Sequence, residues 1–443
     1  MNIPQNVDGG TWLVRPERGL AQRLDSLEGI AFVGVDFGTS TTVVSLVVRD
    51  DPERSIAVRP LILSQPSLHG GVVRDEIVNT VLAFRNDTLL FGRDAYNLRS
   101  RLTEGRNTFS SFKMGLGLDL GPEFGATALP AGRVPGITIE RPADAAREFF
   151  KLLMRAVHEE LAQLGLTRGA RFAFSVPAAF QANQRRDLMA AIRGCGIEVD
   201  ESCLIDEPNA ALLSYVHEVA RSPDGQDLLV RANAGEISVL VYDLGAGTCD
   251  VSLLDFSISA NRVTSRNRAI SKFTALGGDD IDREIARRIL LGQLRQADGS
   301  VVELTALDIE EKVVPALAPA AEKLKVAISK MMADKNVGRL DAARRLPDLV
   351  FETQAVPQFK LRGAVVGIET PALSVHQFLD ILGPFCGPRR GADASRHLVG
   401  PVHDVLDKAS LDPSEVDAVL FIGGSAQNPL VRAAVMDLFP PEV

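Results

Sequence analysis

The order of apolar and polar residues along the chain predicts short strands that alternate with helices. Predicted strands lie at 30–48 (a hairpin), 78–92 (two strands around an Asn-Asp turn), 170–176, 204–205, 238–253 (a second hairpin) and 418–422. Predicted helices lie at 144–164, 182–193, 209–220, 276–291 and 317–333, and another begins at Asn428-Pro429. Residues 222–236 are predicted to form a linker between two halves, and 336–395 show no clear pattern. Strands that alternate with helices indicate an α/β protein.

The two predicted hairpins resemble each other. One contains Asp36-Phe-Gly-Thr-Ser-Thr-Thr-Val-Val-Ser-Leu46 and the other Asp243-Leu-Gly-Ala-Gly-Thr-Cys-Asp-Val-Ser-Leu253, with six of eleven positions identical. Each has an apolar strand, an Asp, a turn containing Gly and a second strand. Ordinary turn chemistry would explain one such hairpin. Two matched copies predict a duplicated fold that holds one ligand between its halves.

The residues of these turns indicate which ligand is held. Glycine lets another group approach the backbone closely, and a turn rich in Gly and Thr presents backbone N–H groups to an anion. Thr39, Ser40 and Thr248 add hydroxyl donors. Asp36 and Asp243 end apolar strands, and carboxylates there suit Mg²⁺, held through its waters. The two turns therefore predict a site for a phosphate and a magnesium ion.

Two further segments contain candidate site residues. Glu207 follows a predicted strand and precedes Pro208, which suits the first position of a helix. Glu207 is therefore either a helix-capping residue or a catalytic carboxylate at the end of a strand. The strand at 418–422 is followed by Gly423-Gly424-Ser425, a candidate nucleoside site. No GxxxxGK[ST] sequence occurs, which excludes a P-loop site, and the Gly115-Leu-Gly117 pair does not fit a dinucleotide fingerprint.

Composition narrows the class of protein further. The 443 residues suffice for two to four domains. The 48 basic and 57 acidic residues give a net charge of −9, which argues against a nucleic-acid partner. The four cysteines form no metal or CxxC spacing, which predicts reduced thiols and a cytoplasmic location. No apolar run is long enough to cross a membrane, and residues 1–29 are predicted to be an N-terminal extension without a secretory signal.

Six motifs in order carry a family resemblance. They are Asp36-Phe-Gly-Thr-Ser40, Asp206-Glu-Pro-Asn-Ala-Ala211, Asp243-Leu-Gly-Ala-Gly-Thr-Cys-Asp250, Leu276-Gly-Gly-Asp-Asp280, Ala321-Glu-Lys-Leu-Lys325 and Phe421-Ile-Gly-Gly-Ser425. The series resembles the ATPase domain of the seventy-kilodalton heat-shock protein (DnaK-type chaperone) family, within the actin-like ATPase superfamily, over about residues 30–440. The resemblance implies a two-lobed actin-like ATPase fold, with duplicated ribonuclease-H-like lobes and a central nucleotide cleft. The N-terminal extension at 1–29 would precede lobe I at 30–222 and lobe II at 223–443.

The resemblance also implies a role for each matched residue. Asp36 and Asp243 would orient the waters of Mg²⁺, Glu207 and Asp250 would position the attacking water, and Lys113 would contact the γ-phosphate. Pro177 and Arg185 match a relay between the nucleotide and a partner domain. The remaining matched residues would bind ATP or ADP: Gly38, Thr39, Ser40, Gly245, Ala246, Gly247 and Thr248 the phosphates, and Gly278, Glu322, Lys325, Ser329, Gly423, Gly424, Ser425 and Asn428 the adenosine.

The chain departs from the family pattern at three places. Ala246 stands where the family usually has Gly, and it would cost about 1 kcal/mol if the position required a positive φ. Val326 replaces an Arg that would stack on adenine. The family pattern would continue beyond Val443 with a final strand and helix, an apolar linker and a peptide-binding domain.

The resulting prediction is an ATPase with slow, Mg²⁺-dependent hydrolysis, chaperone-like, whose lobes open and close with the nucleotide. A co-chaperone, a nucleotide-exchange factor or a separate client-binding chain would be its partners. Three alternatives stay open: an actin-like polymerising or cell-division ATPase, a small-molecule kinase of the same superfamily, and a nucleotide sensor without turnover.

Overall fold

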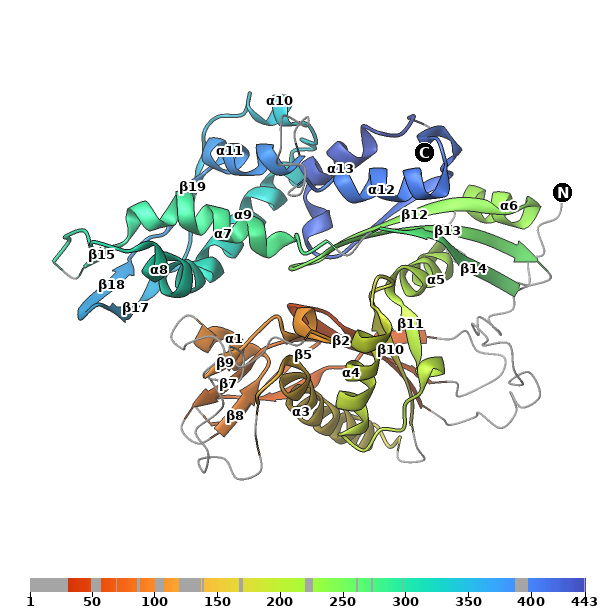
Figure 1. The fold of residues 1–443 in the computed structure, drawn as a ribbon, viewed down its shortest axis with the longest axis horizontal. Coiled ribbons are helices and arrows are strands. Elements are labelled where there is room, and N and C mark those ends of the chain that lie inside the picture. The colour runs from red at the N-terminus through yellow and green to blue at the C-terminus, as the bar shows by residue number, and fades with distance from the viewer. Residues whose placement is uncertain are drawn as a thin grey trace. The chain divides into compact units, whose positions relative to one another are not determined.

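The computed structural model describes residues 31–443 apart from 49–56, 69, 86–87, 100–106, 119–136, 138, 167–169, 220–225, 260–261, 272–273, 297, 387–396 and 442. The N-terminal extension predicted at 1–29 and the Asn86-Asp87 turn lie outside the described residues. Contacts divide the chain into two compact units (Figure 1). The first unit comprises 1–96, 105–241 and 252–270, and the second comprises 97–104, 242–251 and 271–443.

A mixed six-stranded sheet forms the centre of the first unit. Its strands are β1 (Ala31–Phe37), β2 (Thr41–Val48), β3 (Ala57–Pro60), β6 (Ile77–Asn79), β10 (Ala170–Val176) and β11 (Leu204–Asp206). The order is β11-β10-β1-β2-β3, with β6 paired to β2. β1, β10 and β11 run parallel, whereas β1 and β2 form the antiparallel hairpin that the sequence predicts. The carboxyl ends of the three parallel strands therefore meet at one edge, where α/β sheets commonly bind ligands.

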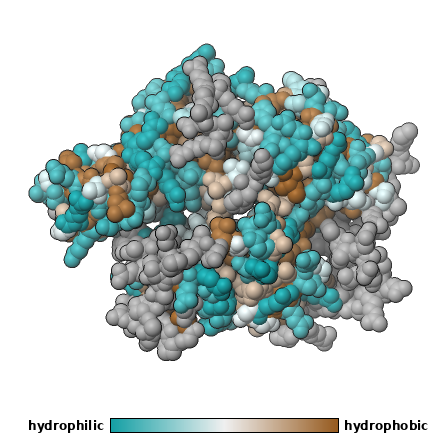
Figure 2. Space-filling model, in the orientation of Figure 1, coloured by the Kyte–Doolittle hydropathy of each residue, from teal (hydrophilic) through white to brown (hydrophobic). Residues whose placement is uncertain are grey.

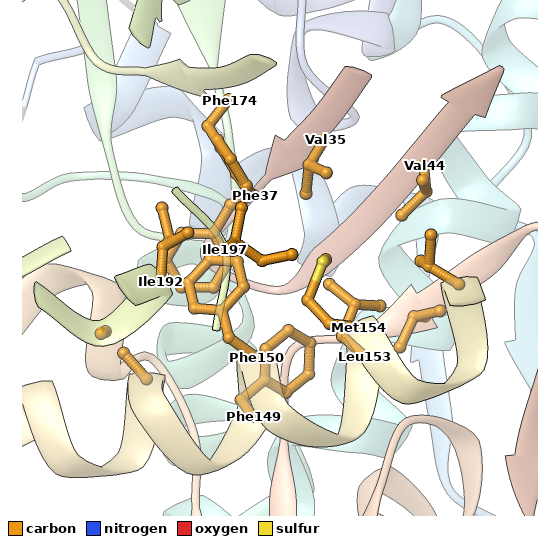
Figure 3. Packing of buried hydrophobic residues seen from close by; sticks show 14 of the residues in the cluster. Val35, Phe37, Val44, Phe149, Phe150, Leu153, Met154, Phe174, Ile192 and Ile197 are labelled. Carbon is orange, nitrogen blue, oxygen red and sulfur yellow. The ribbon is translucent and has the colours of Figure 1, made fainter. Parts of the chain in front are cut away.

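The main helix against this sheet is α3 (Pro142–Gln163), close to the predicted 144–164. Pro142 opens it, and the Asp144 carboxylate, at the third helical position, accepts a hydrogen bond from the backbone N–H of the N-cap residue Arg141 at 3.0 Å. Phe149 and Phe150 of α3 point toward the strands (Figure 3), and the rings of Phe150 and Phe37 lie 4.8 Å apart. This buried aromatic core fixes the end of β1.

The other elements of the first unit are short. Further helices include α4 (Ala182–Arg193), which has the predicted bounds, α5 (Glu207–Val219) and the 3₁₀ turn η4 (Phe112–Gly115). The small sheets pair β4 (Leu63–Pro66) with β5 (Val72–Asp75), and β7 (Leu82–Arg85) with β8 (Thr88–Phe91) and β9 (Thr108–Phe109). Helix α1 (Arg93–Leu98) follows β8. α6 (Gln226–Ala234) occupies the segment predicted as a linker, so the prediction of a loop throughout 222–236 was wrong.

A four-stranded sheet contains the second predicted hairpin. Its strands are β12 (Ile237–Leu244), β13 (Cys249–Ser259), β14 (Arg262–Ile270) and β20 (Ala418–Ile422), in the order β14-β13-β12-β20. The boundary between the two units passes along β12 and β13, so that the turn between these strands belongs to the second unit. β12 is buried along nearly its whole length, because apolar residues occupy both faces.

Helices make up most of the second unit. They are α7 (Gly278–Arg288), α8 (Ala306–Asp308), the π-helix η7 (Ile309–Val313), α9 (Val314–Asp334), α10 (Leu340–Ala343), α11 (Val375–Cys386), α12 (Gly400–Ala409) and α13 (Pro429–Met436). The stretch without a clear pattern contains β16 (Val350–Glu352) paired with β19 (Ala372–Ser374), and β17 (Val356–Leu361) paired with β18 (Ala364–Ile368), which also pairs with β15 (Arg295–Gln296). Figure 2 shows apolar side chains exposed over β15, β17 and β18. Among the helices that the structure describes, none has the length and apolar character to cross a bilayer.

Candidate functional site

The turn between β1 and β2 is the first candidate site. The Gly38 N–H donates to the Thr41 carbonyl at 3.0 Å and closes the turn. A Cβ on Gly38 would overlap that carbonyl. Glycine is therefore required by the close approach of the backbone and not by its φ, which is not positive. Thr39 is buried, and the Ser40 carbonyl accepts from the Thr80 N–H at 2.7 Å. The backbone of this turn is therefore fixed from both sides.

Asp36 stands at the carboxyl end of β1, immediately before this turn. Its carboxylate accepts a hydrogen bond from Ser175 Oγ at 2.6 Å. The sequence analysis missed Ser175, although a signal exists: the parallel register that pairs Val35 with Phe174 brings the next residues, Asp36 and Ser175, side by side. Ser175 thus fixes the orientation of the predicted magnesium-orienting carboxylate.

Lys113 and Glu207 form a buried ion pair in the same unit. Lys113 Nζ lies 2.8 Å from Glu207 Oε1, and their side chains are 6% and 14% exposed. The ammonium also lies over the rings of Phe37 and Phe180, 5.7 and 5.9 Å from their centroids. The sequence predicts both residues but not their contact. The pair therefore places two opposite charges, both largely removed from solvent, at the carboxyl edge of the sheet.

Asp206, the last residue of β11, precedes Glu207. Arg185 Nη2 of α4 lies 2.6 Å from Asp206 Oδ1, and Arg185 Nε donates to the Phe180 carbonyl at 3.2 Å. Each of the two adjacent carboxylates therefore contacts its own cation, Asp206 an arginine and Glu207 a lysine. The sequence analysis placed Arg185 in a relay but did not identify Asp206 as its partner.

The turn between β12 and β13, in the second unit, repeats the geometry of the first turn. The Gly245 N–H donates to the Thr248 carbonyl at 3.0 Å, and these residues align with Gly38 and Thr41. Ala246 is not among the residues with positive φ, so the strain considered for it is absent. The two turns of the predicted internal repeat are thus closed by the same backbone hydrogen bond.

This second turn packs on the start of α7. The first two helix N–H groups donate to turn carbonyls: Gly278 to Gly245 at 3.1 Å, and Asp279 to Ala246 at 2.7 Å. A Cβ on Gly277 would overlap the Ala246 carbonyl. Gly277 is therefore needed for contact between the turn and the helix.

The Asp243 end of β12 contacts the glycine pair that follows β20. Gly423 has φ +85°, and a Cβ there would overlap the Leu244 carbonyl and lie 2.7 Å from Asp243 Oδ1. Gly424 has open space around it. Asp250 is buried on β13. The structure thus brings together Gly423, predicted to bind adenosine, and Asp243, predicted to orient the waters of Mg²⁺.

Lys325 on α9 joins several predicted adenosine residues. Its Nζ donates to Asp282 Oδ2 at 2.7 Å and to the Gly278 carbonyl at 3.0 Å, and a Cβ on Gly278 would overlap Ser425 Oγ. Burial raises the pKa of Asp282 to about 7, and the Lys325 ammonium opposes this rise. Asp282 was not predicted from the sequence, although it lies four residues after Gly278 and hence on the same face of α7.

The remaining adenosine candidates also lie on or near α9. Ser329 Oγ donates to the Lys325 carbonyl at 2.8 Å and accepts from Asn428 Nδ2 at 2.8 Å, while the Asn428 side-chain oxygen caps α13. Glu322 Oε2 lies 3.9 Å from Arg99 Nη2. Val326, at the position where an arginine was expected, is 56% exposed. Gly278, Lys325, Ser329, Ser425 and Asn428 therefore form one connected group.

Comparisons with known proteins show which proteins the chain resembles. The family model described as Hsp70 protein matches residues 154–343. The chain is 26% identical over 421 residues to the chaperone protein DnaK of Thermus thermophilus, a match that covers 93% of this chain and 57% of that protein. The match to this family model and the likeness to DnaK over most of the chain support membership of the Hsp70 family. The mixed α/β architecture is consistent with the actin-like ATPase fold that Hsp70 membership implies.

Other Hsp70 relatives match over a similar range. The DnaK of Mycoplasma mycoides is 26% identical over 418 residues, covering 93% of this chain and 55% of that protein. The chaperone protein dnaK3 of Synechocystis is 27% identical over 419 residues, covering 93% of this chain and 46% of that protein. The chain thus spans about half the length of the curated Hsp70 relatives it matches.

Proposed function

We propose that this Hsp70-family chain binds ATP with Mg²⁺ and hydrolyses it slowly, as the ATPase part of a chaperone-type activity. The observation that carries the proposal is the buried ion pair of Lys113 and Glu207 at the carboxyl edge of the first unit's sheet, 2.8 Å between Nζ and Oε1. Phosphoryl transfer needs a positioned water, a metal ion and positive charge near the phosphates, and little covalent chemistry from the protein.

The residues of the first unit would carry the chemistry. Lys113 would place its positive charge on the terminal phosphate, and Glu207 would orient the attacking water and accept its proton. The N–H groups of the turn at Gly38, Thr39 and Ser40 would donate to phosphate oxygens. The ion pair supports these roles, because each group is already desolvated and held at a fixed position before any ligand binds.

The residues of the second unit would bind the rest of the nucleotide. Gly245, Ala246, Gly247 and Thr248 would donate to phosphate oxygens, with Asp250 near the attacking water. The group around Lys325, with Gly278, Glu322, Ser329, Gly423, Gly424, Ser425 and Asn428, would bind adenosine. The absence of strain at Ala246 supports its place in the phosphate turn, because the turn keeps its closing hydrogen bond with Ala at this position.

Magnesium fits the donors that are present. Among the residues that the structure describes, no three His, Cys, Asp or Glu side chains converge in the way a protein-only metal cage requires. Mg²⁺ commonly keeps several waters and binds one or two carboxylates plus substrate phosphates. Asp36, which Ser175 orients, and Asp243 would hold the metal through its waters. The bound ion would supply positive charge to the phosphate oxygens.

We further propose that the two lobes of the actin-like fold move relative to each other as nucleotide is bound and cleaved. The family resemblance supports this motion. A co-chaperone, a nucleotide-exchange factor or a separate client-binding chain would couple to it. Limited proteolysis with ADP, with ATP and without nucleotide tests the motion, and identical digestion in all three states would contradict it.

The deciding experiment is ATP binding and single-turnover hydrolysis with Mg²⁺, for the wild type, Lys113→Ala and Glu207→Ala. A matched control is Lys330→Ala, which removes an exposed lysine from α9. We expect wild-type binding in all four proteins and loss of cleavage in the first two variants only. Binding without cleavage in the wild type would instead indicate a nucleotide sensor. Unchanged cleavage in both Lys113→Ala and Glu207→Ala would overturn the site assignment.

A further inference from the structure

A series of side-chain hydrogen bonds in the first unit leads from Asp206 to β14. Asp206 Oδ1 accepts from Arg185, and Oδ2 accepts from Asn267 Nδ2 at 2.9 Å. Asn209 Nδ2 donates to Asn267 Oδ1 at 3.2 Å, and Ser265 Oγ donates to Asn209 Oδ1 at 2.6 Å. These residues come from β11, α4, α5 and β14. We call Asp206, Asn209, Ser265 and Asn267 the Asp206 network.

The direction of every bond in the Asp206 network follows from the charge at its end. An ionised carboxylate only accepts hydrogen bonds, so Asn267 must turn its NH₂ group toward Asp206. Its oxygen then accepts from the NH₂ group of Asn209, whose own oxygen is left to accept from the Ser265 hydroxyl. No member can turn its amide without placing two donors or two acceptors face to face. The network therefore has one consistent arrangement, which restricts the side chains that compose it.

The pattern of exposure along β14 shows that this arrangement belongs to one face of the strand. Ser265 and Asn267 are half-buried, whereas the neighbouring Thr264 and Arg266 are exposed. Successive side chains of a strand point to opposite faces, so Ser265 and Asn267 share a face that Thr264 does not. Thr264 is therefore a matched control position on the same strand.

Glu207 lies between two anchored residues of the chain. Asp206 precedes it at the end of β11, and Asn209 follows it in the first turn of α5. Both belong to the Asp206 network, so the backbone that carries Glu207 is tied to β14 on each side. The Glu207 side chain itself points to Lys113 at 2.8 Å. Fixing the strand-to-helix junction fixes the origin of that side chain.

We propose that Asn267, acting through Asp206 and Asn209, is a positioning residue for Glu207 in ATP hydrolysis. This inference rests on the proposed function, because it assumes that Glu207 orients the attacking water. Asn267 contributes no group to the reaction. Its effect is to keep the Glu207 carboxylate in register with Lys113, since small displacements of a catalytic group lower rates steeply.

The test compares single-turnover ATP hydrolysis by the wild type, Asn267→Leu, Glu207→Ala and the double variant, with ATP affinity measured for each. Leucine keeps the size of asparagine and removes its hydrogen-bonding groups. We expect Asn267→Leu to lower the rate about tenfold with ATP affinity within about twofold of the wild type. In the Glu207→Ala background the same substitution should change the remaining rate by less than about twofold, because residues that act as a unit are not additive.

Controls separate positioning from a purely structural role. Thr264→Ala, on the opposite face of β14, should keep the wild-type rate. Ser265→Ala removes only the far end of the Asp206 network and should lower the rate of hydrolysis less than Asn267→Leu does. If Asn267→Leu does not fold, Ser265→Ala still tests the network. A full tenfold loss repeated in the Glu207→Ala background, or a wild-type rate for both Asn267→Leu and Ser265→Ala, would overturn the inference. A wild-type rate for Glu207→Ala would instead overturn the proposed function.

Discussion

The ion pair of Lys113 and Glu207 gives a stability prediction that does not depend on any ligand. Lys113→Met keeps the length and apolar stem of the side chain and removes its charge. Glu207→Gln keeps the shape of the carboxylate and removes its charge. The two single variants and the double variant form a double-mutant cycle with the wild type, which isolates the interaction between the two side chains from their other contacts.

The burial of the pair sets the magnitude. Removing one partner of a buried ion pair costs about 3–5 kcal/mol, whereas an exposed pair contributes about 1 kcal/mol or less. Lys113 is 6% exposed and Glu207 14%, and they are 2.8 Å apart, so we expect the lower end of the buried range, about 3 kcal/mol, for each single variant. The double variant should be destabilised by about 4 kcal/mol rather than 6, a coupling energy of about 2 kcal/mol.

Urea denaturation followed by far-ultraviolet circular dichroism measures the four free energies of unfolding. Additive effects, with a coupling energy below about 0.5 kcal/mol, would refute the reasoning, since side chains in direct contact should couple by more than that. The pair would then contribute no more than a solvent-exposed one.

Three more predictions concern the second unit. Gly423→Ala should destabilise the protein by about 2 kcal/mol or more, because φ is +85° and a Cβ would overlap the Leu244 carbonyl. Gly424→Ala, in open space, should change the free energy of unfolding by less than about 0.5 kcal/mol. Equal effects of the two substitutions in denaturant titrations would contradict this prediction. The pKa of Asp282 is raised from 3.8 to about 7, so its protonated form stabilises the fold at low pH and that stabilisation is lost as the pH rises to about 7. Relative to the wild type, Asp282→Asn should therefore gain stability from pH 4 to 7 in thermal unfolding, and a constant difference would refute the shift. Ala246→Gly should lower the free energy of unfolding by about 0.5 kcal/mol, because the position needs no positive φ and glycine adds freedom to the unfolded chain. An increase in the free energy of unfolding would contradict this prediction.

Local sequence patterns predicted most of the elements near the site. The prediction of a helix at about 182–193 agrees with α4, because Gly194 marks its end. α6 was missed because its nine residues follow Ser222-Pro-Asp-Gly225, whose turn propensity suggested a loop for the whole segment. A short helix with a weak pattern depends on its tertiary contacts, which the sequence does not display.

The candidate residues were easier to predict than the contacts between them. Asp36 and Arg185 were identified from motifs, but their partners come from distant segments. Ser175 reaches Asp36 through the parallel register of β10, and Asp206 at the end of β11 pairs with Arg185. A polar residue at the end of a strand has no distinguishing pattern until the neighbouring strand is known. Long-range partners of this kind therefore required the structure.

The way the second turn rests on α7 has a consequence for how the sequence can vary. The two carbonyls of the turn, at Gly245 and Ala246, are held by the N–H groups of Gly278 and Asp279, so main-chain atoms alone make these bonds. At 279 the bond needs only a backbone N–H, whereas at 278 a Cβ would also overlap Ser425 Oγ. A proline at either position would abolish a bond. Where main-chain atoms alone make the bonds, a change of side chain does not remove them. The turn can keep its shape while its side chains diverge, as the alanine at 246 illustrates.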